Sequence, residues 1–185
     1  IALINLGHIE QIGTPIEVYT NPANEYVATF LGAANVLAGV VKNRNIEVGA
    51  ALIPLRENDN FADGQKVKLV FRPEDVVLTK SGDAPRDAAC IARGIVELTS
   101  FAGAYERVSV RIDLSDAGSC EPEETPYYLT TQTPESQTSK PIIATRTKPD
   151  ATAVKLQQGD RVAVNLSSFT VLADIPPRGT EGRRQ

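Results

Sequence analysis

The stretch HIEQIGTPIEVYTNPAN, residues 8–24, decides how the rest of this chain is organised. A short polar strand ends at Gly13, where the residue pattern changes to that of a helix start. Thr14 is in the N-cap position, Pro15 is in the first helical position, and Glu17 completes a capping box with Thr14. The sequence therefore predicts a strand followed closely by a helix that begins at Pro15.

A second helix is predicted directly after the first. Asn21 and Pro22 have the residue types of an N-cap and a first helical position, and Gly32 is a natural C-terminal stop. The apolar residues between them have the spacing of one helical face, and they are Ala23, Tyr26, Val27, Phe30 and Leu31. By spacing alone, residues 14–32 are two short capped helices on a small core, since caps report structure and not chemistry.

Composition and charge describe an ordinary globular chain. The 185 residues are 42% hydrophobic and 23% charged, which is normal for a globular protein. There are 19 Lys and Arg against 23 Asp and Glu, which gives a net charge of −4. This balance, without a concentrated basic stripe, argues against nucleic acid as a partner. No run approaches the roughly 20 apolar residues needed to cross a bilayer, so we expect no direct membrane insertion.

The first residues, Ile1-Ala2-Leu3-Ile4, are already those of a buried strand, and the sequence contains no Met. We therefore expect the chain to be the C-terminal part of a longer protein, with a β-hairpin over residues 1–13. Cys90 and Cys120 lack the spacing of a zinc or redox pair and are predicted to be ordinary thiols.

From Asn35 onward the sequence is a series of short β-strands separated by turn-forming residues. A polar linker, residues 80–85, divides the strands into two groups. The predicted strands are residues 36–42, 46–48, 67–72 and 76–79 in the first group, and 90–99, 106–114, 142–147, 161–166 and 170–173 in the second.

The two groups resemble a degenerate repeat. Residues 64–71 and 159–166 share the pattern Gly-polar-basic-Val-x-apolar-x-apolar, and Gly39 in the first group corresponds to Gly94 in the second. A Gly inside a strand marks a bend or bulge, which a small closed barrel needs at its corners. We predict a mainly β fold: an OB-like barrel built from two degenerate strand units, either as half-barrels or as packed barrels, preceded by a short hairpin and two short helices.

The predicted domain organisation follows from these patterns. Residues 1–35 form the hairpin and helical connector, and residues 36–175 form the barrel, with units at about 36–80 and 88–175. Residues 115–150 are rich in Ser, Thr, Pro, Glu and Gln and are predicted to be a mobile insertion. The tail, residues 176–185, is predicted to be disordered.

The N-terminal residues resemble a known family. Residues 1–15, 17–19, 21–24 and 30–32, together with Asn35, are similar to the end of the nucleotide-binding domain of ABC importer ATPases. The relevant branch carries a C-terminal regulatory domain, whose second half is called TOBE, and includes sulfate, ferric-iron, polyamine and maltose importers. The resemblance continues through Phe71-Arg72-Pro73-Glu74-Asp75-Val76, which is similar to a signature of the same regulatory domain.

The resemblance implies a role for each part of the chain. Residues 1–35 would be the end of the nucleotide-binding domain and its connector to the regulatory TOBE domain. The connector residues that carry the family pattern are Gly13, Thr14, Pro15, Glu17, Tyr19, Asn21 and Pro22. The longer protein would couple hydrolysis of ATP, with magnesium, to solute uptake. It would lie on the cytoplasmic face of the inner membrane through permease subunits. The connector would act as a hinge to a regulatory domain that holds two copies together as a homodimer.

The chain itself lacks the sequence features of ATP hydrolysis. It contains no G-x-x-x-x-G-K-[ST] phosphate loop and no signature motif of the family. His8, the one histidine, is not the family's switch histidine, which lies upstream of this hairpin. We therefore expect this chain to have no enzymatic activity, no catalytic residue, no bound cofactor and no metal site.

Arg72, Pro73, Glu74 and Asp75 are the predicted site of a regulatory or dimer contact, as the resemblance implies. Pro73 interrupts the ladder between two strands, so its neighbours lie at a bend where Arg72 can pair with Glu74 or Asp75. The alternative interpretation is a structured turn with a surface ion pair worth ~0–1 kcal/mol.

Three functions follow from the sequence. The leading hypothesis is the regulatory and dimerisation domain of the ATP-binding subunit of an ABC-type import system. The alternative is a solute-sensing regulatory module that binds an oxyanion or a metal ion. A nucleic-acid-binding OB protein is opposed by the acidic balance and by the lack of interleaved aromatic and basic residues.

Overall fold

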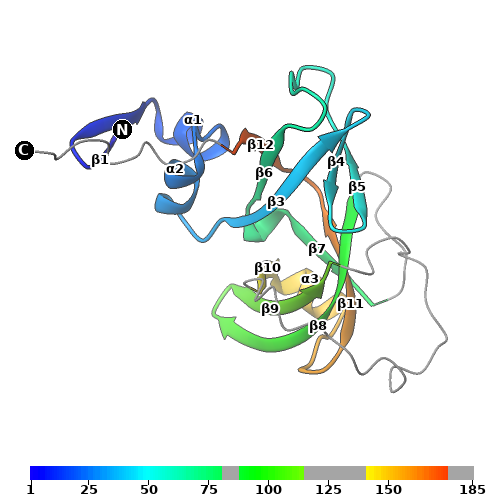
Figure 1. Ribbon diagram of the computed structural model, residues 1–185. Helices are drawn as coiled ribbons and strands as arrows, with labels where there is room; N and C mark the ends of the chain where they lie inside the picture. The colour runs from blue at the N-terminus through cyan, green and yellow to red at the C-terminus, as the bar shows by residue number, and fades with distance from the viewer. Residues whose placement is uncertain (81–87, 115–140, 175–185) are drawn as a thin grey trace, which may run out of the picture.

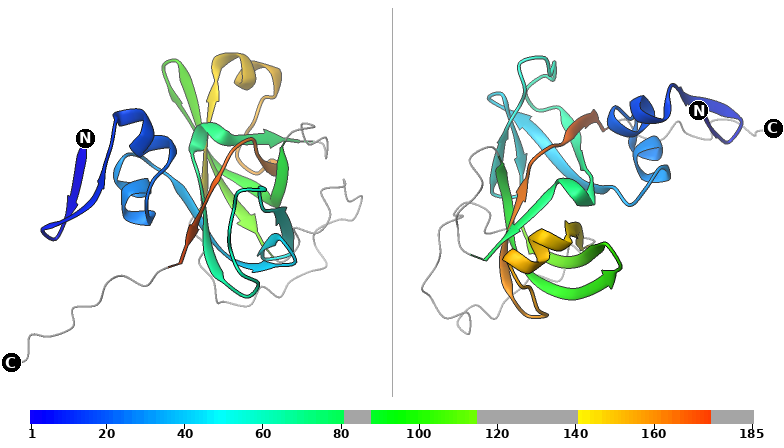
Figure 2. Two further views of the ribbon diagram at one scale, coloured as in Figure 1. Left: turned by 90° about the horizontal axis from the view of Figure 1, so that it is seen from above. Right: turned by 180° about the vertical axis from the view of Figure 1, so that it is seen from behind.

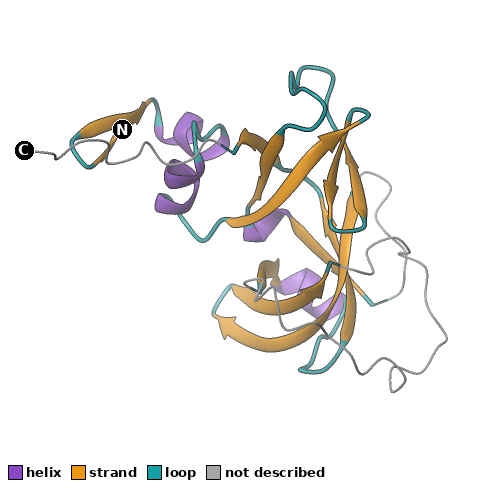
Figure 3. Ribbon diagram, in the orientation of Figure 1, coloured by secondary structure: helices purple, strands orange, loops and turns teal. Residues whose placement is uncertain are grey.

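The computed structural model describes residues 1–80, 88–114 and 141–174. Two five-stranded antiparallel sheets form a barrel, and a smaller helical unit of one hairpin and two helices projects from one side of it (Figure 1). Figure 3 shows that strands make up most of the barrel. The predicted mainly β, OB-like fold with a hairpin and two helices before the barrel is confirmed.

The helical unit begins with the predicted hairpin, in which β1 (Ala2–Asn5) pairs with β2 (His8–Ile12). Helix α1 (Pro15–Thr20) then begins with the predicted capping box. The Thr14 amide donates to Glu17 Oε2 at 2.8 Å, and the Glu17 amide donates to Thr14 Oγ1 at 3.3 Å. The Thr14 amide, and then the Thr14 hydroxyl, donate to the Glu17 carboxylate and hold its pKa below its usual value.

The start of the second helix differs from the prediction. Helix α2 (Glu25–Phe30) has Asn24 as its N-cap, and the Asn24 side chain accepts a hydrogen bond from the Val27 amide at 3.0 Å. Asn21, predicted to be this cap, is instead the C-cap of α1, because its amide still donates to the Glu17 carbonyl at 2.9 Å. The Asn-Pro pair therefore ends one helix and does not begin the next.

The first sheet has the strand order β12-β6-β3-β4-β5. Its strands are β3 (Asn35–Lys42), β4 (Asn45–Val48), β5 (Ala51–Pro54), β6 (Lys66–Phe71) and β12 (Thr170–Ala173). The sequence did not predict β5, which lies at the edge of the sheet, where the ladder tolerates Pro54.

The second sheet has the strand order β10-β9-β8-β11-β7. Its strands are β7 (Val76–Thr79), β8 (Ala89–Ala102), β9 (Tyr105–Asp113), β10 (Ile142–Thr147) and β11 (Arg161–Leu166). A 3-10 turn, η1 (Pro73–Asp75), precedes β7, and helix α3 (Lys148–Ala153) connects β10 to β11.

The two predicted strand units exchange their last strands. Strand β7 belongs to the first unit but pairs with β11 of the second, and β12 belongs to the second unit but pairs with β6 of the first. Each five-stranded sheet therefore contains one strand from the other unit. The units form one structure around a shared core, and not two barrels packed together.

Backbone pairing supports the predicted repeat. Gly39 lies opposite Val67 in the first sheet, and Gly94 lies opposite Val162 in the second. The following turns also correspond. The Gly64 amide donates to the Val41 carbonyl at 2.7 Å, and the Gly159 amide donates to the Val96 carbonyl at 2.8 Å. Equivalent residues therefore make equivalent bonds in the two halves.

Other predictions need correction or fall on residues that are not described. The predicted strand 142–147 is confirmed as β10, and residues 148–150 begin α3, so the mobile insertion, which was also predicted to include these residues, was predicted to end too late. The rest of that insertion, most of the linker and the tail lie outside the described residues. Cys90, predicted to be a thiol, is disulfide-bonded.

Candidate functional site

The predicted site residues meet where the helical unit joins the barrel. Figure 2 shows the hairpin and helices beside the first sheet, with β12 next to the helices. The two groups that the sequence singled out, the connector residues 13–22 and the motif residues 72–75, come together at this junction. They are more than fifty residues apart in the chain.

Arg72 lies at the centre of the junction. Arg72 is only 7% exposed. Its Nη1 donates to the Ala28 carbonyl at 2.7 Å, and its Nη2 donates to the Tyr19 carbonyl at 3.0 Å. Both carbonyls belong to the last turns of their helices, where no intrahelical partner exists. One guanidinium from the barrel thus caps the C-terminal ends of α1 and α2.

Tyr19 contacts the barrel through its ring and its hydroxyl. The Arg72 guanidinium carbon lies 4.0 Å from the centroid of the ring, within the range of a cation–π interaction. The hydroxyl donates to Glu74 Oε1. Burial, then the hydrogen bond to the Glu74 carboxylate, raises the pKa of Tyr19, so the hydroxyl remains a donor at neutral pH.

Pro73 and Asp75 shape the turn that presents these side chains. Pro73 begins η1, and the Arg72 amide donates to Asp75 Oδ2 at 3.2 Å. Burial raises the pKa of Asp75, which this bond partly offsets. The predicted pairing of Arg72 with Glu74 or Asp75 across the bend is wrong for the guanidinium, which donates to the helices, whereas the Asp75 carboxylate accepts from the Arg72 backbone amide.

A second set of contacts joins α2 to the first sheet. Lys68 of β6 bonds Glu25 of α2 and also lies 3.0 Å from Asp174 Oδ1, just after β12. The hydrogen bond to Glu25, then that to Asp174, raises the pKa of Lys68. Beneath this pair, Ala28 packs with Val70 in a small apolar cluster. Sequence reasoning missed these residues, because the sequence pattern around a lysine on the outer face of a strand does not show whether a helix packs over it.

Side chains of β2 join the hairpin to the helices. The Gln11 amide group donates to the Asn21 carbonyl at 3.0 Å and accepts from the Ala23 amide at 2.8 Å, while the Asn24 side chain donates to Glu10 at 2.7 Å. The hairpin and both helices therefore form one packed unit.

The remaining connector residues have structural positions within this unit. Pro22 is buried between the helices. At Gly13, a Cβ would lie 3.2 Å from Val18 Cγ2, so a small residue suits the close approach of α1.

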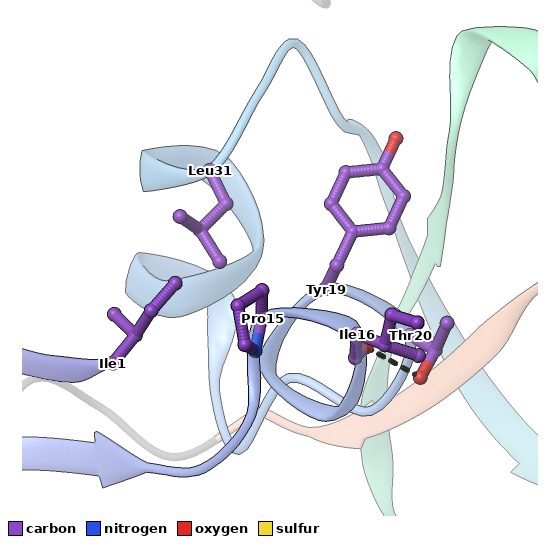
Figure 4. Close-up of a pocket in the computed structure, with 6 residues that line it drawn as sticks. All are labelled: Ile1, Pro15, Ile16, Tyr19, Thr20 and Leu31. Carbon is purple, nitrogen blue, oxygen red and sulfur yellow. Dashed lines mark hydrogen bonds between the residues drawn. The ribbon is translucent and has the colours of Figure 1, made fainter.

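Two hollows lie beside α1. The larger, of about 330 Å³, is lined by Ile1, Pro15, Ile16, Tyr19, Thr20 and Leu31 (Figure 4). A smaller one, of about 180 Å³, lies between the helices and the barrel and includes Arg72, Glu74 and Phe169. Large apolar side chains are also exposed on this unit, and they include Ile4, Leu6, Ile9, Ile12, Ile16 and Phe30.

Two searches of the described residues bear on other classes of site. Within residues 1–80, 88–114 and 141–174, no cluster of three or more His, Cys, Asp or Glu side chains is placed to hold a metal ion. No helix in the described parts of the chain is long and apolar enough to span a membrane.

Sequence comparison finds relatives among import proteins. No family model matches the chain. It is 38% identical over 124 residues to the spermidine/putrescine import ATP-binding protein PotA of Oleidesulfovibrio alaskensis, which covers 64% of this chain and 33% of the relative. It is 38% identical over 112 residues to the sulfate/thiosulfate import ATP-binding protein CysA 2 of Chromobacterium violaceum, covering 60% and 29%. The chain spans about a third of the length of these relatives.

Structure comparison supports the barrel. The cytoplasmic molybdate-binding protein ModG, solved with molybdate bound, matches with a TM-score of 0.50 and 16% identity, over 75% of this chain and 95% of that one. At this identity the match shows the fold alone. The sequence relatives confirm the predicted resemblance: the homologues of this chain are ATP-binding subunits of ABC importers.

Proposed function

We propose that this chain is the regulatory domain, with its connector, of the ATP-binding subunit of an ABC import system. The observation that carries this proposal is the match to importer ATP-binding proteins over 64% of the chain. In this chain a helical connector meets an OB-like barrel. The longer protein would bind ATP and magnesium and couple hydrolysis to solute uptake. The residues described here contribute the regulatory part.

The junction would link the ATP-binding part to the barrel. Arg72 caps both helices, and Tyr19 and Lys68 add further contacts. These contacts favour a fastened connection over the hinge expected from sequence, so that movement of the helical unit would carry the barrel with it. The exposed apolar side chains of the hairpin and α1 would face the rest of the ATP-binding domain.

The proposed partners follow from this role. The ATP-binding domain would dock on permease subunits at the cytoplasmic face of the inner membrane, and the barrel would hold two copies of the subunit together. The edge strands of the two antiparallel sheets offer surface for such pairing.

ATP hydrolysis and subunit association test the proposal. We expect the longer protein to hydrolyse ATP and to co-purify with a permease, and a variant without residues 36–174 to keep hydrolysis but lose its control and its dimerisation. Lys42→Gln, which removes an exposed ion pair with Glu47 at the far end of β3 from the helices, is a matched control. Absence of hydrolysis and of permease binding in the intact protein would contradict the proposal.

Sedimentation velocity of the 185-residue chain tests the dimerisation role separately. A dimer at micromolar concentration is the expected result. A chain that stays monomeric at millimolar concentration would remove dimerisation from the proposal and leave the regulatory role to be judged by hydrolysis.

A further inference from the structure

The helical unit and the barrel have separate hydrophobic cores. Among the described residues, the main core of the barrel begins at Leu37, whereas Leu3, Val18 and Val27 form the core of the helical unit. A region with its own core opens at a lower free energy than the whole fold when few apolar contacts join it to its neighbour. The junction therefore decides whether the two move together.

Apolar contact across the junction is small. Ala28 of α2 packs on Val70 and Leu172 of the first sheet, and these three residues form a cluster apart from both cores. Interfaces between separate units of a chain are typically more polar than a continuous core and permit relative motion.

Polar and charged side chains make the remaining contacts. We use the name clasp for the residues Arg72, Tyr19, Glu74, Lys68 and Glu25. They are joined by the two carbonyl bonds of the guanidinium, its contact with the tyrosine ring, the hydroxyl bond to Glu74 and the ion pair of Lys68 with Glu25.

We propose that the clasp is a releasable fastening. When it opens, α1 and α2 leave the barrel while both sheets stay folded. The fastened state is the one in the structure, and the opened state exposes Arg72, Tyr19 and Val70. In the proposed importer subunit, opening would uncouple the regulatory barrel from the ATP-binding part. That consequence rests on the proposed function, whereas the opening itself does not.

The position of the charges makes such opening feasible. Arg72 is buried beneath the ends of the two helices, so their departure hydrates its guanidinium and leaves no unpaired charge in the interior. Glu74 is already exposed in the closed state. Leaving a buried charge without a partner is the main penalty of breaking an internal ion contact, and this penalty is avoided here.

The connection between the units is short and contains a glycine. Residues 31–34 join α2 to β3, and Gly32 has a φ of +151°. The Ala34 amide donates to the Gly32 carbonyl at 2.8 Å and makes a tight turn. Because glycine adopts a wide range of backbone angles, this segment is able to turn when the clasp opens.

Hydrogen exchange of the 185-residue chain measures the opening directly. Arg72→Gln removes hydrogen bonds made by a charged group, so exchange in α1 and α2 should rise by about 10- to 100-fold. Exchange of the slowest amides in β3, β6 and β11 should change by less than about threefold, because the main core is untouched. Tyr19→Phe keeps the ring beneath the guanidinium and loses one hydroxyl bond, so the same helices should exchange about 3- to 10-fold faster.

Arg146→Gln is the matched control, because Arg146 is a second buried arginine that caps a helix, but within the barrel. It should speed exchange in α3 and the second sheet, with no preference for α1 and α2. Raising sodium chloride should mimic Arg72→Gln weakly, because the Lys68–Glu25 pair is partly exposed.

Two results would overturn the proposal. If Arg72→Gln speeds exchange equally in the helices and in β6 and β11, the junction belongs to the global fold. If it leaves α1 and α2 unchanged, the clasp does not fasten them. Should Arg72→Gln fail to fold, Tyr19→Phe and Glu25→Gln decide by the same criterion. Exchange needs neither ATP nor a permease, so its failure is distinct from failure of the proposed function.

Discussion

The first half of the barrel carries Arg72 after β6, the second half carries Arg146 on β10, and these two buried arginines fasten different kinds of structure. Arg146 is 5% exposed and bonds Glu106 Oε2 at 2.8 Å, and it donates to the carbonyls of Asp150, within α3, and of Val154, the C-cap of α3. Arg72 donates to carbonyls of α1 and α2 and lies over a tyrosine ring. Among the described residues, Arg146 forms an ion pair with a carboxylate, whereas the bonds of the Arg72 guanidinium go to backbone carbonyls.

The difference follows from where each helix lies in the chain. Helix α3 connects two strands of one sheet, so its cap belongs to the barrel and its charge is neutralised there. Helices α1 and α2 precede the barrel and have their own core. The same local device, a buried arginine that donates to helix carbonyls, therefore stabilises a single cooperative unit in one half and joins two units in the other.

The largest expected effect is at Arg146. Arg146→Met leaves the partly buried Glu106 and the Val154 carbonyl without the hydrogen bonds of the guanidinium, which should lower the free energy of unfolding by about 1.5–3 kcal/mol. Urea denaturation followed by circular dichroism measures this change, and Arg146→Lys, which keeps the charge, should recover part of it. A loss below about 1.5 kcal/mol would show that this ion pair is no more structural than Arg72.

Glycine replacements compare the repeat across the two halves. A Cβ at Gly94 would lie 2.5 Å from Val110 Cγ1 and 2.7 Å from the Arg111 carbonyl oxygen. A Cβ at Gly39 would meet Ile46 Cγ2 at 2.6 Å and the Glu47 carbonyl oxygen at 3.0 Å. Overpacking of this kind destabilises by ~1–3 kcal/mol, and Gly94→Ala should be the more costly because backbone yields less than a side chain. Thermal unfolding measures both, and the reverse order would mean that the halves are not packed alike.

The sequence predicted the repeat because its signal is local. Glycines inside strands and the pattern shared by residues 64–71 and 159–166 are visible without any partner. The exchange of β7 and β12 between sheets was not predictable in this way, because strand pairing depends on residues distant in the chain. Helix α3 was missed although Thr147 and Asp150 form a capping box, which is the same signal that located α1.

The site was predicted in part for a similar reason. The residues of the junction were found, since both motifs stand out, but the partner of Arg72 was assigned wrongly. Its acceptors are backbone carbonyls 44 and 53 residues away, and a carbonyl carries no residue-type signal. A carboxylate two or three positions along the chain was the partner that the sequence displayed.

A smaller effect on overall stability is expected at Arg72. Arg72→Gln removes bonds at the junction and leaves the main core intact, so the barrel transition in urea should shift by less than about 1.5 kcal/mol. The loss of stability should be concentrated in the helical unit. This unit should unfold at a lower urea concentration than the barrel, as a separate transition in the circular dichroism signal of the helices. A single transition displaced by as much as that of Arg146→Met would break the comparison, because both arginines would then belong to one cooperative unit.

The smallest expected effect concerns two aspartates whose pKa values are shifted in opposite directions. Burial raises the pKa of Asp75 beside Arg72, whereas the Lys80 ammonium lowers that of Asp160 in the second half. A raised folded-state pKa means that the native state holds the proton more tightly than the unfolded chain. The Asp75 contribution therefore favours folding at acid pH and is lost as pH rises through the folded pKa. Asp160 contributes in the opposite sense, with stability present above the unfolded value of 3.8 and lost as pH falls through the lowered pKa.

Melting temperatures between pH 3 and 7 separate these contributions. Asp75→Asn keeps an oxygen to accept the Arg72 amide and removes the charge, so it should raise the melting temperature slightly at pH 7 and have no effect at pH 3, where both forms are neutral. Lys80→Gln, the matched change for Asp160, removes their 2.8 Å ion pair and should lower the melting temperature slightly at pH 7. Both shifts in melting temperature should be small, because solvent screens the exposed Asp160 and Asp75 is only partly buried. A lower melting temperature for Asp75→Asn at pH 7 would mean that the ionised carboxylate stabilises the η1 turn more than burial penalises it. The turn that presents Arg72 and Glu74 would then depend on charge as well as on Pro73.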